Sequence, residues 1–91
     1  MKYNVDFEPQ AKTDFAKLKK SEPKCYKKAI NLVFELQEHP TTGTGKPEQL
    51  KHYEIPTWSR RISDRHRLVY QIHENIVTVL VIAAYGHYED K

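Results

Sequence analysis

The last third of the chain is rich in residues that favour β-strands, and two short polar connections divide it. The segments are "WSRRIS" (58–63), "RLVYQIH" (67–73) and "IVTVLVIAAY" (76–85), separated by "DRH" and "EN". Connections this short join neighbouring antiparallel strands. We therefore expect a three-stranded antiparallel meander. Because "IVTVLVIAA" is apolar on both faces, it is expected to be the most buried of the three strands.

The first part of the chain changes from strand to helix periodicity. Apolar and polar residues alternate over 2–7, which predicts a strand. Helical spacing of apolar residues then predicts one helix from 9 to about 20, and a second from Ser21, its N-cap, to near 39. Two such helices form an antiparallel hairpin whose apolar stripe needs a flat surface to cover. The 91 residues are too few for a second core, so we expect a single α+β domain, 1–91, with the N-terminal strand and the helical hairpin packed on the antiparallel sheet.

Most of the prolines and glycines lie between residues 39 and 57, which predicts a long loop. Loops of this length in a small domain are commonly functional. The charged residues Lys46, Glu48 and Lys51 favour a functional loop here.

All four arginines lie within 60–67, whereas lysines occur throughout the chain. The net charge is +3, and the four arginines less Asp64 give +3 in this segment alone. Because arginine binds phosphate with two donors, the patch predicts an anionic partner, with nucleic acid favoured over a membrane. No apolar run is long enough to span a membrane, and no basic amphipathic helix carries the patch.

Strand alternation divides the four arginines between different positions. Arg67 is expected on the open face of the sheet, opposite the face that holds Leu68, with Arg61 beside it across the hairpin. Arg60 should point the other way, toward the margin of the sheet, and Arg65 should lie in the turn.

The cysteine and histidine content argues against several classes of site. The single Cys25 cannot form an internal disulfide, and the N-terminus lacks the apolar core of a secretory signal, so a cytoplasmic protein is expected. No pair of histidines has the spacing or carboxylate company of a zinc site, so we expect no metal. His66 and His73 flank a strand and are expected at exposed turn positions.

Several remaining residues could together cleave RNA without a metal. That reaction needs a base for the 2′-hydroxyl proton, a cation for the pentacoordinate phosphate and an acid for the departing 5′-oxygen. A carboxylate, arginines and a histidine could supply these roles. The candidates are Glu48, Lys51, Arg61, Arg67, His87 and Tyr88. Each of them taken alone also fits an ordinary surface position.

The order of "GKPEQLKH", "WSRRISDRHRLVY" and a late "GHY" resembles the YoeB/Txe family of bacterial toxins in the RelE superfamily. The resemblance implies a RelE/YoeB-like fold similar to that of microbial ribonucleases. It also implies a cofactor-free endoribonuclease that cuts mRNA in the A site of the 70S ribosome and inhibits translation. By motif position, Glu48 would be the base, Arg67 the phosphate clamp and His87 the acid.

Further expectations follow from the same resemblance. Lys51 and Arg61 would add positive charge around the phosphate, and Tyr88 would lie beside the acid. The arginine patch itself adds Arg65 as a further residue that binds RNA. The implied partners are mRNA, the ribosome, a YefM-like antitoxin and a second copy of the chain in a homodimer. One departure from the family pattern is the "EDK" extension after Tyr88, whose two carboxylates could raise the pKa of His87 or extend into solvent.

Two other functions remain open at this stage. A ParE-like toxin with a related fold would poison DNA gyrase by binding, and would not require Glu48, Arg67 and His87 together. A basic RNA-binding module without activity would explain the arginines but not the accompanying carboxylate and histidine.

Overall fold

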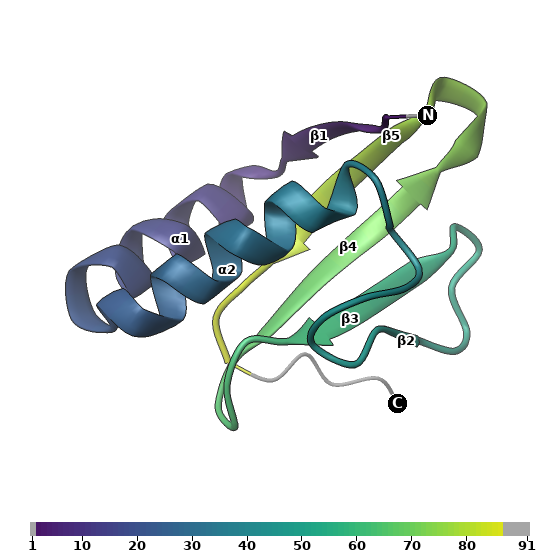
Figure 1. The fold of residues 1–91 in the computed structure, drawn as a ribbon. Coiled ribbons are helices and arrows are strands. Elements are labelled where there is room, and N and C mark those ends of the chain that lie inside the picture. The colour runs from purple at the N-terminus through teal and green to yellow at the C-terminus, as the bar shows by residue number, and fades with distance from the viewer. Residues whose placement is uncertain (1, 87–91) are drawn as a thin grey trace.

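Two helices cover one face of a five-stranded mixed sheet in the computed structural model, which describes residues 2–86 (Figure 1). The helices are α1 (Pro9–Ser21) and α2 (Pro23–Leu36). The strands are β1 (Asn4–Phe7), β2 (Glu48–Gln49), β3 (Thr57–Arg61), β4 (Arg67–His73) and β5 (Thr78–Ala83), with a short 3-10 turn, η1 (Glu74–Ile76), between the last two. No helix in the described range is long and apolar enough to cross a membrane.

The strand order is β1-β5-β4-β3-β2, which confirms the predicted meander of β3, β4 and β5. Two features differ from the expectation of a purely antiparallel sheet. β1 joins the edge of β5 in parallel, with Val5 opposite Val79, and the loop contributes the short strand β2. The helical hairpin between β1 and the rest of the sheet supplies the long crossover that a parallel pair requires.

β4, not β5, is the most buried strand. It lies at the centre of the sheet, and Leu68, Val69 and Tyr70 are inaccessible to solvent. β5 is next to the short edge strand β1, so Leu80 remains partly exposed despite its apolar side chain. The apolar composition of β5 therefore led to an overestimate of its burial. How much of a strand is shielded from solvent also depends on its position in the sheet.

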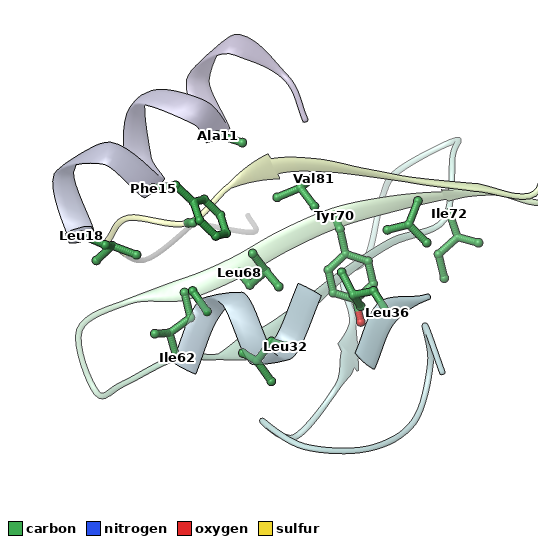
Figure 2. Packing of buried hydrophobic residues seen from close by; sticks show 13 residues of the cluster. Ala11, Phe15, Leu18, Leu32, Leu36, Ile62, Leu68, Tyr70, Ile72 and Val81 are labelled. Atoms are coloured by element: carbon green, nitrogen blue, oxygen red, sulfur yellow. The ribbon is translucent and has the colours of Figure 1, made fainter. Parts of the chain in front are cut away.

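The core lies between the helices and one face of the sheet (Figure 2). Leu68, Tyr70 and Ile72 of β4 face the helices, as strand alternation predicted. They pack with residues from both helices and β5, among them Ala11, Phe15, Leu18, Leu32, Leu36 and Val81. Burying such side chains stabilises the fold by about 1.5–3 kcal/mol each.

The two helix boundaries near the joint differ from the predicted ones. Ser21 does not cap α2; it ends α1, where its hydroxyl donates to the carbonyl of Lys17 at 2.7 Å. Glu22 lies at the junction instead, because its N–H closes α1 on Leu18 and its carbonyl starts α2. α2 ends at Leu36, before His39, as the chain turns into the loop.

Candidate active site

The long loop after α2 is held in place by a buried arginine. Arg60 of β3 is inaccessible to solvent and faces the helices, because it pairs with Leu68 in the register of β3 and β4. The expectation that it reaches the sheet margin is wrong. Its Nη1 lies 2.7 Å from Oε1 of Glu35, and its Nε donates to the Tyr70 hydroxyl at 3.1 Å. An enclosed guanidinium requires acceptors of this kind on every side.

The remaining donors of Arg60 bind carbonyls of the loop itself. Nη1 donates to Thr44 at 3.2 Å, and Nη2 donates to Thr42 at 2.7 Å and to His39. The Tyr70 hydroxyl in turn donates to the carbonyl of Pro40 at 2.7 Å. A segment of the loop without regular secondary structure therefore has a fixed path across the end of the core.

Glu35 completes this arrangement from α2. Its Oε1 also accepts the Thr44 N–H at 2.6 Å. Burial raises the pKa of Glu35, but the hydrogen bonds from Thr44 and the contact with Arg60 outweigh it and hold the pKa below its ordinary value. Burial raises the pKa of Tyr70, with a smaller opposing effect from Arg60. The carboxylate is thus ionised where it meets the guanidinium.

Gly45 carries the loop from this anchor onto the edge of β3. Its carbonyl accepts the Arg61 N–H at 2.6 Å, and its φ is +86°. A Cβ there would lie 3.0 Å from the Arg61 carbonyl oxygen, so the close approach and the left-handed backbone both favour glycine. Lys46 follows with φ of 50°, a left-handed backbone conformation that is strained for residues other than glycine.

Three of the predicted site residues share the open face of the sheet. β2 pairs with β3 so that Glu48 is opposite Ser59, and Arg61 is opposite Arg67 in β4. Side chains of paired residues lie on one face, and alternate residues of a strand share that face. This pairing and alternation therefore place the side chains of Glu48, Arg61 and Arg67 on the face of the sheet away from the helices. The predicted pairing of Arg61 with Arg67 is confirmed.

These residues line a hollow of about 310 Å³ together with Lys46 and Pro47. Three cationic side chains face one carboxylate, which gives the hollow a positive balance. The Nε–H of Arg61 is buried and has no acceptor within residues 2–86, while its Nη1 is 3.9 Å from the exposed Asp64. A buried donor without a partner is costly unless a ligand supplies the acceptor. The hollow therefore suits an anion such as a phosphate.

The other predicted site residues lie elsewhere. Lys51 is exposed beyond the end of β2 and is not among the residues that line the hollow. Arg65 is exposed in the β3–β4 turn, where its Nη2 lies 3.0 Å from Oε1 of Glu22. His87 and Tyr88, with the Glu89–Lys91 extension, lie outside the described residues.

Lys46, which the sequence placed in a functional loop without making it a site residue, lines the hollow together with Pro47. The sequence did not predict that Arg60 with Glu35 holds the loop that carries them. A signal for Arg60 was present, since strand alternation places it on the apolar face opposite Leu68, where an arginine must find buried acceptors. His66 was also misplaced: it is 3% exposed, not at an exposed turn position.

A family model described as a YoeB-like toxin of bacterial type II toxin-antitoxin systems matches residues 7–88. The chain belongs to this family. The toxin YoeB of Mycobacterium bovis is 40% identical over 77 residues, covering 85% of this chain and 91% of the relative. The YoeB dimer from Staphylococcus aureus has a similar structure, with a TM-score of 0.82 and 31% identity over 97% of this chain and 100% of the other.

A second structure places the family fold in a complex. The YoeB-YefM complex from Staphylococcus aureus matches this YoeB-like chain with a TM-score of 0.78 and 32% identity, over 97% of this chain and 100% of the matched chain. The helical hairpin on a five-stranded mixed sheet is therefore the fold of YoeB toxins.

Proposed function

We propose that this YoeB-like toxin is an endoribonuclease that cuts mRNA in the ribosomal A site. The observation that carries the proposal is the meeting of Glu48, Arg61 and Arg67 in one hollow on the open face of the sheet. The hollow combines a proton acceptor with cations, which are two of the three kinds of group that transphosphorylation of RNA requires. Membership of the YoeB-like toxins supports the same reaction.

In the proposed mechanism, Glu48 removes the proton of the ribose 2′-hydroxyl. The 2′-oxygen then attacks the adjacent phosphorus, and the bond from phosphorus to the 5′-oxygen breaks. Arg67, with Arg61, stabilises the added negative charge of the pentacoordinate phosphate through donors that are already in place. His87 gives a proton to the departing 5′-oxygen, a role assigned from its position in the sequence motif. The products are a 2′,3′-cyclic phosphate and a 5′-hydroxyl.

The electrostatic setting of the hollow fits this assignment. Within residues 2–86, Arg67 forms no ion pair with a carboxylate, so its charge is available to a phosphate. Glu48 is exposed at the sheet edge, where RNA can reach it. Lys51, Arg65 and Tyr88 would add contacts to RNA around the site, and the reaction requires neither a metal nor another cofactor.

The proposed partners follow from the family. The Staphylococcus aureus relative forms a dimer and binds YefM. We infer that this chain likewise forms a homodimer and is neutralised by a YefM-like antitoxin in the cytoplasm.

The test is translation of a defined mRNA in a cell-free system, followed by mapping of new 5′-hydroxyl ends. Wild-type protein should produce such ends at ribosome-occupied codons. Arg67→Ala should reduce the rate by about 10²–10³-fold, on the scale of losing one preorganised donor. The control is Lys12→Ala, an exposed lysine on α1, which should cleave like the wild type.

Two outcomes would overturn the proposal. The first is an absence of cleavage by the wild type, and the second is equal cleavage by Arg67→Ala. Gyrase-dependent DNA breakage with translation unaffected would instead favour the ParE-like function.

A further inference from the structure

A buried histidine links the helical joint to the residue where the described chain ends. The side chain of His66 is 4% exposed, and its Nε2 lies 2.6 Å from Oε2 of Glu22. The N–H of Gly86 donates to Nδ1 of the same ring at 2.8 Å. Both ring nitrogens are therefore engaged, Nε2 by Glu22 at the joint between α1 and α2 and Nδ1 by Gly86 after β5.

The hydrogen bond from Gly86 determines which tautomer of the ring is present. A backbone N–H can only donate, so Nδ1 of His66 must be the unprotonated acceptor. The proton of the neutral ring then lies on Nε2, where it is donated to the Glu22 carboxylate. A fully protonated ring would bring a second N–H against that of Gly86 and break the contact.

Glu22 is a rigid partner for this ring. Its backbone closes α1 and opens α2, and its Oε1 lies 3.0 Å from Nη2 of Arg65. The hydrogen bond from His66 lowers the pKa of Glu22; burial opposes this effect, and Arg65 reinforces it. The carboxylate is therefore ionised, and its contact with Arg65 and the place of Glu22 at the helical joint hold it where it orients the imidazole.

A metal site is the other use of such a cluster, since Cys25 also lies close to Glu22 and His66. A histidine that binds a metal uses a free ring lone pair and donates its other N–H to an acceptor. Here the ring has the opposite arrangement, because Nδ1 accepts from Gly86 and Nε2 carries the proton. The contacts of the cluster thus favour orientation of the backbone over binding of a cation.

Gly86 is held on its other side by the proposed site. Its carbonyl accepts the backbone N–H of Arg67 at 3.0 Å. Its φ is +78°, a backbone conformation that glycine adopts without strain. Gly86 is thus hydrogen-bonded to two residues. One is Arg67, the proposed phosphate clamp at the start of β4, and the other is His66, which Glu22 holds at the helical joint. His87, the proposed acid, is the next residue in the sequence.

We propose that His66, oriented by Glu22, is a positioning residue that fixes Gly86 beside Arg67 and so sets the point from which the acid-bearing segment extends. The role rests on the proposed ribonuclease function. It explains why a histidine that does not line the hollow is buried beside an ionised carboxylate. Displacing a catalytic group by about 1 Å can cost about 10²-fold in rate, so an anchor at this position affects catalysis without contacting RNA.

Two substitutions of His66 test the contacts of Nδ1 and Nε2 separately. The amide oxygen of His66→Asn takes the place of Nδ1 and keeps an acceptor for Gly86, but loses the contact with Glu22. The amide nitrogen of His66→Gln takes the place of Nε2 and keeps the donor to Glu22, but removes the acceptor. His73→Asn is the matched control, because His73 lies at the far end of β4 and contacts Gln71 at 3.1 Å.

The experiment measures hydrogen exchange of the Gly86 amide by NMR and, separately, kcat and KM for cleavage of ribosome-bound mRNA. The Gly86 amide should be protected in the wild type and in His66→Asn, and should exchange rapidly in His66→Gln. His66→Gln should lose about 10²-fold in kcat with little change in KM. His73→Asn should remain close to the wild type. His66→Asn, which keeps the acceptor for Gly86 but loses the contact with Glu22, should show a much smaller loss in kcat than His66→Gln. If His66→Gln does not fold, Glu22→Ala, which leaves the ring in place, should give a smaller loss in kcat of the same kind.

Wild-type kcat in His66→Gln, with rapid exchange at Gly86, would overturn the positioning role. An equal loss in His66→Asn and His66→Gln would also overturn it, because a general packing defect affects both. Failure of the proposed function is a different result, since the wild type would then cut no mRNA at all.

Discussion

Replacing Arg60 with methionine should destabilise the protein strongly while changing little of its shape. Methionine keeps an unbranched apolar side chain in the core and removes only the guanidinium. The substitution leaves Glu35 without its 2.7 Å partner and the carbonyls of Thr42 and Thr44 without their donor. The Tyr70 hydroxyl keeps its own acceptor, the carbonyl of Pro40.

The size of this effect can be worked out from the contacts. Removing one partner of a buried ion pair costs about 3–5 kcal/mol. Glu35 is 28% exposed and keeps the Thr44 N–H, so the lower end of that range applies, about 3 kcal/mol. In a domain of this size each kcal/mol shifts the melting temperature by about 4–8 °C, which gives a decrease of about 12–24 °C.

The assay is urea unfolding and thermal melting of the wild type, Arg60→Met and Arg65→Met. Arg65 is also paired with a glutamate, but its side chain is 74% exposed, so its loss should leave the transition close to that of the wild type. An Arg60→Met protein as stable as Arg65→Met would refute the reasoning that the buried guanidinium holds the loop.

Three further predictions concern Gly45 in the long loop, Arg65 in the β3–β4 turn and the loss of folding stability at acidic pH. Gly45→Ala should destabilise the fold by about 1–3 kcal/mol in urea unfolding, because a side chain at its φ of +86° is strained and crowds the Arg61 carbonyl; an unchanged midpoint would contradict this. Arg65→Ala should weaken RNA binding and reduce the slope of log affinity against log salt by about one, with little loss in the rate of cleavage; a salt slope equal to that of the wild type would contradict it. The folded-state pKa of Glu35 lies below its ordinary value of 4.5, so its contribution to stability should be complete above that value and lost as the pH falls through the folded pKa. Unfolding measured from neutral to acidic pH should show this loss, and Glu35→Gln should reduce it; an equal acid dependence in both proteins would count against the assignment.

Strand alternation was sufficient to predict on which face of the sheet the side chains of β3 and β4 lie. It placed Leu68 on the core face and Arg61 beside Arg67 on the open face, both of which the register confirms. These predictions succeed because β3 and β4 are adjacent in sequence and joined by a short turn, so local pattern determines their pairing. The helices were also predictable in number and order from their apolar spacing.

The arrangement of Glu48 in the sheet could not be predicted in the same way. β2 contains only two residues and lies in a segment rich in proline and glycine, where no periodicity can develop. The burial of Arg60 depends on Glu35 and on loop carbonyls that are distant in sequence. The burial of His66 likewise depends on Glu22 and Gly86, which are far from each other in the sequence. Each of these positions is a property of the assembled fold.

The measurement that tests the central claim most directly is a double-mutant cycle on Glu48 and Arg67 under single-turnover conditions. The rate of 5′-hydroxyl formation on ribosome-bound mRNA is measured for the wild type, Glu48→Gln, Arg67→Met and the double variant. If both groups act on one phosphate in the hollow, each single change should reduce the rate strongly, and the double variant should be no slower than the slower single variant. Wild-type rates in both single variants, or losses that multiply in the double variant, would contradict the claim that they act as one site.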